Sequence, residues 1–390
     1  MLWSPQQGRA LSTVAKWIKS RNQQVCRLFG YAGVGKTTLA QHFAEGVNGQ
    51  VLFSAYTGKA ALVLRNKGCR DASTIPRLIY RAEDGFICPN HPDDMYGTNT
   101  DGCRRCDSPL VRRPRFTLNR DSALRSASLL IIDESSMVNE SLGRDLMSFG
   151  KPILVLGDPF QLPPPEGCGF FTAAEPDIML TEVHRQARDS PIIAMSMTVR
   201  EGGRCRYGES RVVAACDLED ADADQILVGL NARRRLVNAT RREELGLTDP
   251  SPMAGDRLVC LRNDRVMGLL NGSLWDVKSV FRDVDTIRMQ IEPDDGDGEG
   301  IEVTTHASFF NELRSYDAFD YGYALTVHRA QGSQWGVVLL VDESARFREN
   351  RARWLYTGIT RAAERWDRPD ERMAVEMAVP ISRIGAAGGA

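Results

Sequence analysis

The strongest constraint on the fold of this chain is a glycine-rich segment, residues 30–37, with the sequence GYAGVGKT. It fits the spacing G-x-x-x-x-G-K-[ST] at every fixed position. Residues 25–29 before it are apolar like a buried parallel strand, and residues 38–44 after it have the character of a helix. This strand, loop and helix order is the context in which backbone N–H groups and a helix N-terminus bind phosphates. The sequence therefore predicts a P-loop and an ATP site.

Each fixed position of the P-loop has an expected role. The glycines let the backbone close around the phosphates, the lysine reaches the β- and γ-phosphates, and the threonine hydroxyl binds Mg²⁺. A chance glycine-rich turn is the alternative, but the correct flanks on both sides disfavour it. The residues expected to contact the nucleotide are Gly30, Gly33, Gly35, Lys36, Thr37 and Thr38.

Length and composition set the broad class of protein. The 390 residues are enough for two or three domains with separate cores. The chain has 42% hydrophobic and 26% charged residues, and no apolar run approaches the ~20 residues that a membrane span needs. No signal-peptide pattern is present at the N-terminus. We therefore expect a cytoplasmic protein with no membrane partner.

Strands and helices alternate along most of the chain, which predicts an α/β fold with parallel sheets. The alternation divides into a first unit over residues 1–178 and a second over residues 179–368. Residues 369–390 end in glycine and alanine and are expected to form a flexible tail. The clearest expected strands are 25–29, 51–55, 128–132, 153–157, 225–229 and 336–341.

Polar side chains that follow two of these strands fit the chemistry of ATP hydrolysis. Asp133 and Glu134 follow the apolar strand at 128–132. Asp133 is placed to hold Mg²⁺, and Glu134 to orient and deprotonate the attacking water. Gln161, in the loop after the strand at 153–157, is a candidate sensor of the γ-phosphate. The alternative for the two carboxylates is a helix cap, which a P-loop in the same chain makes less plausible.

Residues 83–120 interrupt the alternation with a stretch rich in glycine and aspartate. Two pairs of metal-binding residues with C-x₂-C/H spacing lie in it, separated by eleven residues. Such pairs on turns supply four ligands for tetrahedral zinc, so we expect a Zn²⁺-binding knuckle. Coincidental free cysteines in a loop are the alternative. The four candidate ligands are Cys88, His91, Cys103 and Cys106.

A second interruption, residues 253–310, contains short strands and turns. The dipeptide Asn271-Gly272 is typical of a tight hairpin turn. We therefore expect a small antiparallel β-barrel inserted in the second unit.

Charge alone leaves nucleic-acid binding open. The formal net charge is −2, but arginines gather around residues 104–125 and 233–242. Binding depends on where basic residues lie rather than on their sum, and either group could be a solvated face.

The chain resembles superfamily 1 helicases of the RecD/Dda type, in order over nearly its whole length. Segments similar to motifs III, V and VI are specific to this kind of helicase, whereas a P-loop alone is not. The matching segments are 30–37 (motif I), 57–61 (Ia), 133–137 (II), 157–164 (III), 180–186 (IV), 323–334 (V) and 355–362 (VI), and Gln7 matches the adenine-reading glutamine.

The resemblance implies two RecA-like P-loop cores with ATP between them. Arg185 and Arg361 would reach the phosphates from the second core, where an arginine stabilises the charge of the transition state. A surface ion pair is the alternative for either arginine. The same resemblance makes the β-barrel SH3-like and places a duplex-splitting element at the cysteine-rich insert.

DNA contacts also follow from the resemblance. Thr57 and Lys59 would bind the strand on the first core, and Thr326 and His328 on the second. Helix capping is the structural alternative for both threonines, and core packing for His328. Gln7 has an alternative too, because Ser4, Pro5 and Gln7 form a capping-box sequence.

The function implied is that of an ATP-dependent DNA helicase, an ATPase stimulated by single-stranded DNA that moves 5′ to 3′ and acts at duplex forks. Two other functions stay open: a nucleotide-switched loader or clamp that unwinds nothing, and the motor subunit of a larger nuclease complex. Partners from DNA replication, repair or recombination would fit each of them.

Overall fold

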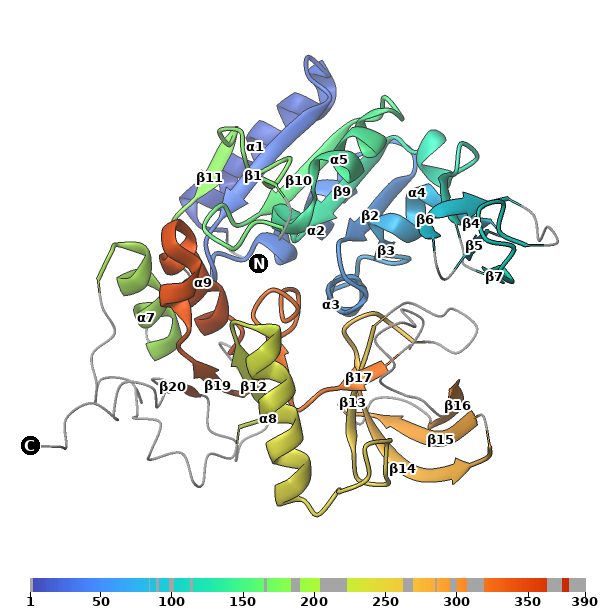
Figure 1. The fold of residues 1–390 in the computed structure, drawn as a ribbon. Helices are drawn as coiled ribbons and strands as arrows, with labels where there is room; N and C mark the ends of the chain where they lie inside the picture. Colours follow the sequence, from blue (N-terminus) through green and yellow to red (C-terminus); the bar gives the residue numbers. More distant parts are fainter. Residues whose placement is uncertain are drawn as a thin grey trace, which may run out of the picture.

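The computed structural model describes residues 3–83, 85–88, 91–97, 102–112, 115–164, 167–183, 190–203, 223–261, 269–284, 286–294, 300–306, 319–362 and 374–378. Two α/β cores lie next to each other, and a cysteine-containing insert and an antiparallel sheet extend from them (Figure 1). Among the helices so described, none has the length and apolarity to cross a bilayer.

The first core is built on a six-stranded parallel sheet in the order β11-β1-β10-β9-β2-β3. The two central strands, β9 and β10, are buried along their whole length, because helices cover both faces of the sheet. The four strands expected in this core are confirmed to within one residue. Their bounds and those of the edge strands are β1 Val25–Gly30, β2 Val51–Ala55, β3 Ser73–Thr74, β9 Leu129–Asp133, β10 Ile153–Gly157 and β11 Ile178–Leu180.

Alternating side chains of these strands fill two hydrophobic clusters. Ile131 packs into the cluster under one set of helices, and its neighbour Ile132 packs into the cluster on the opposite face. The first cluster takes residues from α1 (Pro5–Ser20), α2 (Lys36–Glu45) and α3 (Gly58–Asn66), and the second from α4 (Ile75–Ile79) and α5 (Glu140–Met147). Two short 3₁₀ helices, η1 (Ala123–Arg125) and η2 (Ser135–Met137), complete this core.

The second core has a four-stranded parallel sheet in the order β18-β12-β19-β20. The expected strands at 225–229 and 336–341 are confirmed as β12 (Gln225–Val228) and β19 (Val337–Val341). The remaining elements are β18 (Ala324–Thr326), β20 (Ala374–Ala378), α7 (Pro191–Arg200), α8 (Asn231–Glu244), η4 (Ser344–Asn350) and α9 (Arg351–Ile359).

One strand of the second core lies within the expected tail. β20 pairs in parallel with β19 from Val337 to Val341, and a flexible tail over residues 369–390 stays a prediction. The sequence of β20, Ala-Val-Glu-Met-Ala, is short and only weakly apolar. Its pairing depends on a strand about 35 residues earlier, a long-range contact that local pattern does not reveal. The other residues of 369–390 lie outside the described part of the chain.

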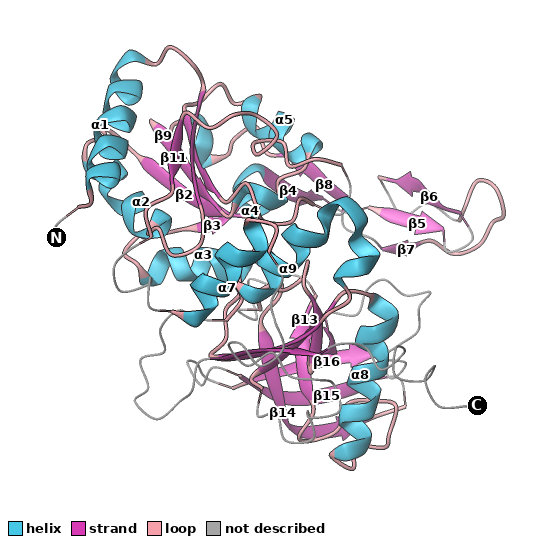
Figure 2. Ribbon diagram, turned by 90° about the vertical axis from the view of Figure 1, so that its left-hand side faces the viewer, coloured by secondary structure: helices cyan, strands magenta, loops and turns pink. Residues whose placement is uncertain are grey.

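The cysteine-containing insert has strands of its own. β4 (Tyr80–Glu83) pairs with β8 (Arg115–Leu118) as an antiparallel stem. Beyond the stem, β5 (Phe86–Cys88), β6 (His91–Tyr96) and β7 (Val111–Arg112) form a small sheet in the order β6-β5-β7. Figure 2 shows this sheet projecting from the edge of the first core.

The second interruption forms a five-stranded antiparallel sheet in the order β16-β15-β14-β13-β17. Its core is a separate hydrophobic cluster that includes Trp275, Met289 and Phe319. The sheet extends past the expected end at residue 310, because β17 pairs with β13. Its strands are β13 Arg257–Cys260, β14 Leu274–Arg282, β15 Thr286–Pro293, β16 Ile301–His306 and β17 Phe319–Tyr321.

Candidate nucleotide site between the two cores

The P-loop joins β1 to α2 with the backbone geometry that the motif requires. Gly33 and Gly35 both have φ near 78°, a conformation that disfavours side chains. Lys36 begins α2, and its Nζ donates hydrogen bonds to the carbonyl oxygens of Gly30 (2.7 Å) and Tyr31 (2.9 Å). The ammonium group is therefore held inside the curve of the loop, beside the N-terminus of the helix.

The two predicted Mg²⁺-binding side chains meet although their strands are not neighbours. Thr37 follows β1 and Asp133 ends β9, with β10 between the two strands. The Thr37 hydroxyl donates a 2.8 Å hydrogen bond to Oδ2 of Asp133, whose residue is only 6% exposed. A hydroxyl and a carboxylate are hard oxygen ligands, so this pair fits Mg²⁺.

Glu134 adopts an unusual backbone conformation directly after Asp133. Its φ is 52°, in the left-handed region, and its backbone N–H donates to Oδ1 of Asp133 at 2.8 Å. Non-glycine residues in this region carry strain that is often found at functional sites. Burial raises the pKa of Glu134, while the nearby charge of Arg361 opposes the shift. A raised pKa favours a role in proton transfer near neutral pH.

Gln161 lies in the buried loop that follows β10. Its Oε1 accepts a hydrogen bond from the Ser136 hydroxyl at 3.4 Å, next to the Asp133-Glu134 segment. Asp158 in the same loop is 1% exposed, and burial raises its pKa against the lowering effect of the Lys36 charge. The loop after β10 therefore places an amide beside the Asp133-Glu134 segment and a second carboxylate near Lys36 of the P-loop.

Arg361 is the one predicted arginine that the described residues include. It lies just after α9, is 3% exposed, and donates to the carbonyl oxygens of Thr357 (3.1 Å) and Ser333 (3.2 Å). It forms no ion pair with a described residue, so a surface ion pair is wrong for this arginine. Its positive charge also lies close enough to Glu134 and Asp158 to oppose the rise that burial causes in the pKa of both carboxyl groups. Arg185 lies outside the described residues.

Gln7 supports the P-loop from α1. The capping box with Ser4 is present, because the Ser4 hydroxyl accepts from the Gln7 N–H and Gln7 Oε1 accepts from the Ser4 N–H at 3.1 Å. Gln7 Nε2 also donates to the carbonyl of Val34 at 3.2 Å, and the residue is 4% exposed. The structural role is confirmed, and reading of adenine stays a prediction.

The predicted DNA-contacting residues all have structural roles as well. Thr57 caps α3 by accepting from the Ala60 N–H at 3.2 Å, and Thr326 accepts from the Arg329 N–H at 3.3 Å. Lys59 and His328 contact aromatic rings, those of Trp335 and Phe347 respectively. Burial lowers the pKa of His328, so the uncharged ring is favoured. Contact with DNA stays a prediction for all four.

The four predicted zinc ligands converge in the insert. The His91 Nδ1 lies 3.7 Å from the Cys88 Sγ and 3.5 Å from the sulfurs of Cys103 and Cys106, and the sulfurs of Cys88 and Cys106 are 3.5 Å apart. All four ligand atoms lie within 4.8 Å of one another. A hydrogen bond from the Tyr96 hydroxyl lowers the pKa of Cys103 to about 6. The cluster has the donor set of a structural zinc site.

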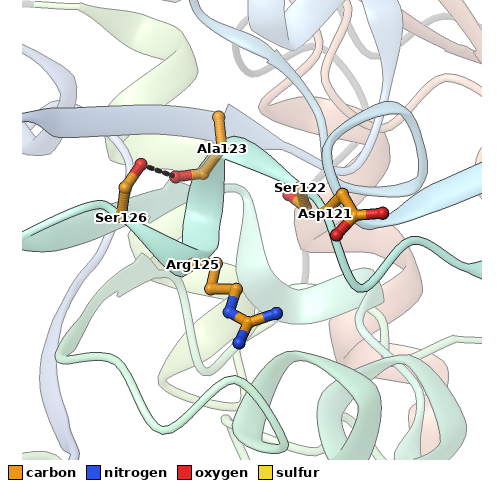
Figure 3. Close-up of a pocket in the computed structure, with 5 residues that line it drawn as sticks. All are labelled: Asp121, Ser122, Ala123, Arg125 and Ser126. Carbon is orange, nitrogen blue, oxygen red and sulfur yellow. Dashed lines mark hydrogen bonds between the residues drawn. The ribbon is translucent and has the colours of Figure 1, made fainter.

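An open hollow of about 470 Å³ lies elsewhere, around η1 (Figure 3). Asp121, Ser122, Ala123, Arg125 and Ser126 line it, and the Ser126 hydroxyl donates within it to the Ala123 carbonyl. None of the predicted site residues belongs to it.

Sequence reasoning missed two pairs of side chains that join the cores. The Tyr356 hydroxyl of α9 donates a hydrogen bond to Asp158, and the guanidinium of Arg200 in α7 lies over the ring of Tyr31. Asp158 and Tyr356 occur in the segments similar to motifs III and VI, but neither pattern by itself assigns them a partner. A buried aspartate directly after a parallel strand was the available signal, because ligands bind at that edge of such sheets.

Residues 3–214 match a family model described as an AAA domain, and residues 321–366 match one described as a UvrD-like helicase C-terminal domain.

The chain is 29% identical over 375 residues to the ATP-dependent RecD2 DNA helicase of Deinococcus radiodurans, covering 87% of this chain and 46% of that protein. It is 24% identical over 351 residues to a probable conjugal transfer protein TraA of Sinorhizobium fredii, covering 80% of this chain and 28% of that protein. The chain thus spans about half, or less, of the length of these relatives.

Solved structures agree on the fold. A Pif1 helicase from Bacteroides in complex with ADP-AlF3 and ssDNA has a TM-score of 0.58 and 18% identity, over 97% of this chain and 92% of that chain. Pif1 helicase from Candida albicans has a TM-score of 0.54 and 16% identity, over 97% of this chain and 94% of that chain. At these identities the likeness supports the arrangement of two α/β cores. Because the AAA domain model covers more than half of the chain, the protein belongs to the AAA domain family.

Proposed function

We propose that this protein is an ATP-dependent DNA helicase that hydrolyses ATP between its two cores and moves along single-stranded DNA. The observation that carries the proposal is the contact between the cores at the P-loop: the Tyr356 hydroxyl of α9 accepts from the Ala32 N–H at 2.9 Å, and the buried Arg361 just after α9 lies near enough to Glu134 for its charge to act on that carboxyl group. The similarity to an ATP-dependent RecD2 DNA helicase over 87% of the chain supports it.

The residues divide the chemistry between the cores. P-loop N–H groups and Lys36 bind the phosphates, Glu134 accepts a proton from the attacking water, and Gln161 orients that water. Arg361 stabilises the charge that spreads over the γ-phosphate oxygens in the transition state. Thr37 and Asp133 would hold Mg²⁺, which neutralises phosphate charge when it is bound. Hydrolysis then requires the two cores to be closed.

Movement along DNA follows from repeated closure and opening between two contacts on the strand. Thr57 and Lys59 belong to the first core and Thr326 and His328 to the second, so closure changes the distance between the pairs. We propose 5′ to 3′ movement and action at duplex forks. For the antiparallel sheet around residues 253–310 we propose an SH3-like module, and for Gln7 a contact with adenine.

We further propose that the insert binds one Zn²⁺. In a tetrahedral site, Zn–S bonds of about 2.3 Å and Zn–N bonds of about 2.0 Å place the ligand atoms roughly 3.5 to 3.8 Å apart. Four of the six separations in the cluster, from 3.5 to 3.7 Å, agree with this spacing, and all four ligand atoms lie within 4.8 Å of one another. The backbone N–H of Arg105 donates a hydrogen bond to the Cys103 sulfur at 3.4 Å. Such contacts outside the ligand set orient metal ligands. The folded insert would serve as the duplex-splitting element.

The helicase proposal is tested by unwinding of duplexes that carry either a 5′ or a 3′ single-stranded tail, with and without ATP. We expect unwinding of the 5′-tailed substrate only when ATP is present. ATP hydrolysis without unwinding of either substrate would favour the loader or clamp function. A preference for the 3′ tail would overturn the polarity but not the helicase.

Replacement of Cys103 and Cys106 by serine is expected to reduce unwinding much more than DNA-stimulated ATP hydrolysis, because it removes half of the zinc ligands and leaves the cores untouched. Elemental analysis of protein purified without chelator should find about one zinc per chain, as four ligands make one site. Cys168→Ser, at an exposed cysteine in the first core, is the matched control and should change neither result. A metal-free protein that unwinds normally would contradict both the metal and its role.

A further inference from the structure

Two helices of the second core hold consecutive residues of the P-loop. The Tyr356 hydroxyl of α9 accepts a hydrogen bond from the Ala32 N–H at 2.9 Å. Next to it, the guanidinium carbon of Arg200, on α7, lies 3.8 Å from the centre of the Tyr31 ring, a cation–π contact. The second core therefore touches the backbone and a side chain of the loop that binds phosphate.

The Tyr356 hydroxyl makes a second bond, to Asp158 of the first core. It donates to Oδ2 at 2.6 Å, and Oδ1 of the same carboxylate accepts from the Phe160 N–H at 2.9 Å. Tyr356 and Asp158 are each 1% exposed. A hydrogen bond to a buried carboxylate is stronger than one between neutral groups, and its loss removes the donor from one of the two carboxylate oxygens. One hydroxyl thus links the P-loop, the end of β10 and α9.

The two helices act as a unit in placing Arg361. Met195 and Val199 of α7 share a hydrophobic cluster with Tyr356 and Ile359 of α9. Arg361 follows α9 directly, and its Nε is fixed by the carbonyl of Thr357 in that helix. A shift of α9 at Tyr356 would therefore move the guanidinium of Arg361.

We propose that Tyr356 and Arg200 form a clamp on the P-loop that positions Arg361 for catalysis when the cores close. Both are positioning residues, because they act through α9 and the loop rather than on the reacting atoms. The inference rests on the proposed ATP hydrolysis and assigns it two residues that closure requires. Through the clamp, the conformation of the P-loop determines the position of the second core.

The test compares Tyr356→Phe with Tyr80→Phe, which removes a tyrosine hydroxyl that donates to Asp145 inside the first core alone. We expect Tyr356→Phe to lower kcat about tenfold, the effect of one hydrogen bond to a charged group, with a much smaller change in KM for ATP. The affinity of this variant for ADP with aluminium fluoride should fall by a similar factor. Its affinity for ADP alone should stay within about twofold of that of the parent protein. Tyr80→Phe should leave all three quantities near those of the parent protein.

Arg200→Gln provides a second variant should Tyr356→Phe fold poorly, with thermal unfolding of each variant as the check. Arg200→Gln is also expected to lower kcat. The kcat of the double variant should fall by less than the product of the two single-variant factors. Equal kcat and equal aluminium fluoride affinity for Tyr356→Phe and Tyr80→Phe would overturn the clamp and leave the proposed function standing. A parent protein that hydrolyses no ATP would overturn the proposed function, and the clamp with it.

Discussion

Glu134→Gln is expected to lower ATP turnover at least ~10²-fold while ATP and Mg²⁺ still bind. The amide keeps the size of the side chain and can still orient a water, but it cannot take the proton. Steady-state hydrolysis and equilibrium binding of a fluorescent ATP analogue measure the two effects separately. Near-normal turnover of this variant would show that another group is the base.

Lys36→Ala should differ from Glu134→Gln in its effect on nucleotide binding. Its ammonium lies inside the P-loop, so its loss should weaken nucleotide binding as well as hydrolysis. Glu140→Gln serves as the matched control, because Glu140 is an exposed carboxylate of α5 whose partner, Arg144, lies on the same helix. This control should turn over ATP at the rate of the parent protein.

Arg361→Ala is expected to lower the DNA-stimulated rate of ATP hydrolysis on the order of 10³-fold, the lower range for an arginine that stabilises phosphoryl transfer. Binding of single-stranded DNA should change little, because Arg361 is buried at the interface between the cores. Hydrolysis is measured with and without single-stranded DNA, and DNA affinity by fluorescence anisotropy.

Arg353→Ala is the control for this prediction, since Arg353 is an exposed arginine of α9, the helix that Arg361 follows. It should retain the stimulation by DNA. If the parent protein hydrolysed ATP at one rate whether or not DNA was present, coupling between DNA binding and core closure would be excluded, and an unrelated P-loop enzyme would be favoured.

The parts of the fold that the sequence predicts well are those determined by neighbouring residues. The P-loop, the capping box at Ser4 and the apolar strands β1, β9 and β10 each follow from a short pattern with one dominant physical cause. The cluster of three cysteines and His91 belongs here too, because the spacing within each pair is local. Convergence of the two pairs is confirmed by the separations of their sulfur and nitrogen atoms.

The contacts between the cores could not be predicted in this way. The bond between Tyr356 and Asp158 joins residues 198 positions apart. Whether a tyrosine in a helix finds such a partner depends on how two separate sheets pack, which no local pattern encodes. The motif resemblance placed Arg361 near ATP, but its bonds to backbone carbonyls, rather than to a carboxylate, became evident only in the structure.

The caps at Thr57 and Thr326 have a consequence for the predicted grip on DNA. A capping hydroxyl accepts a hydrogen bond through a lone pair, so its own proton takes no part in the cap. Each threonine can then hold a helix end or turn and donate to a phosphate oxygen at the same moment. Capping also fixes the direction of the hydroxyl oxygen before any strand arrives, so little rotamer freedom is lost on contact. The observed capping role and the predicted strand-binding role of these side chains are therefore compatible, and we expect serine to preserve both and valine to abolish both.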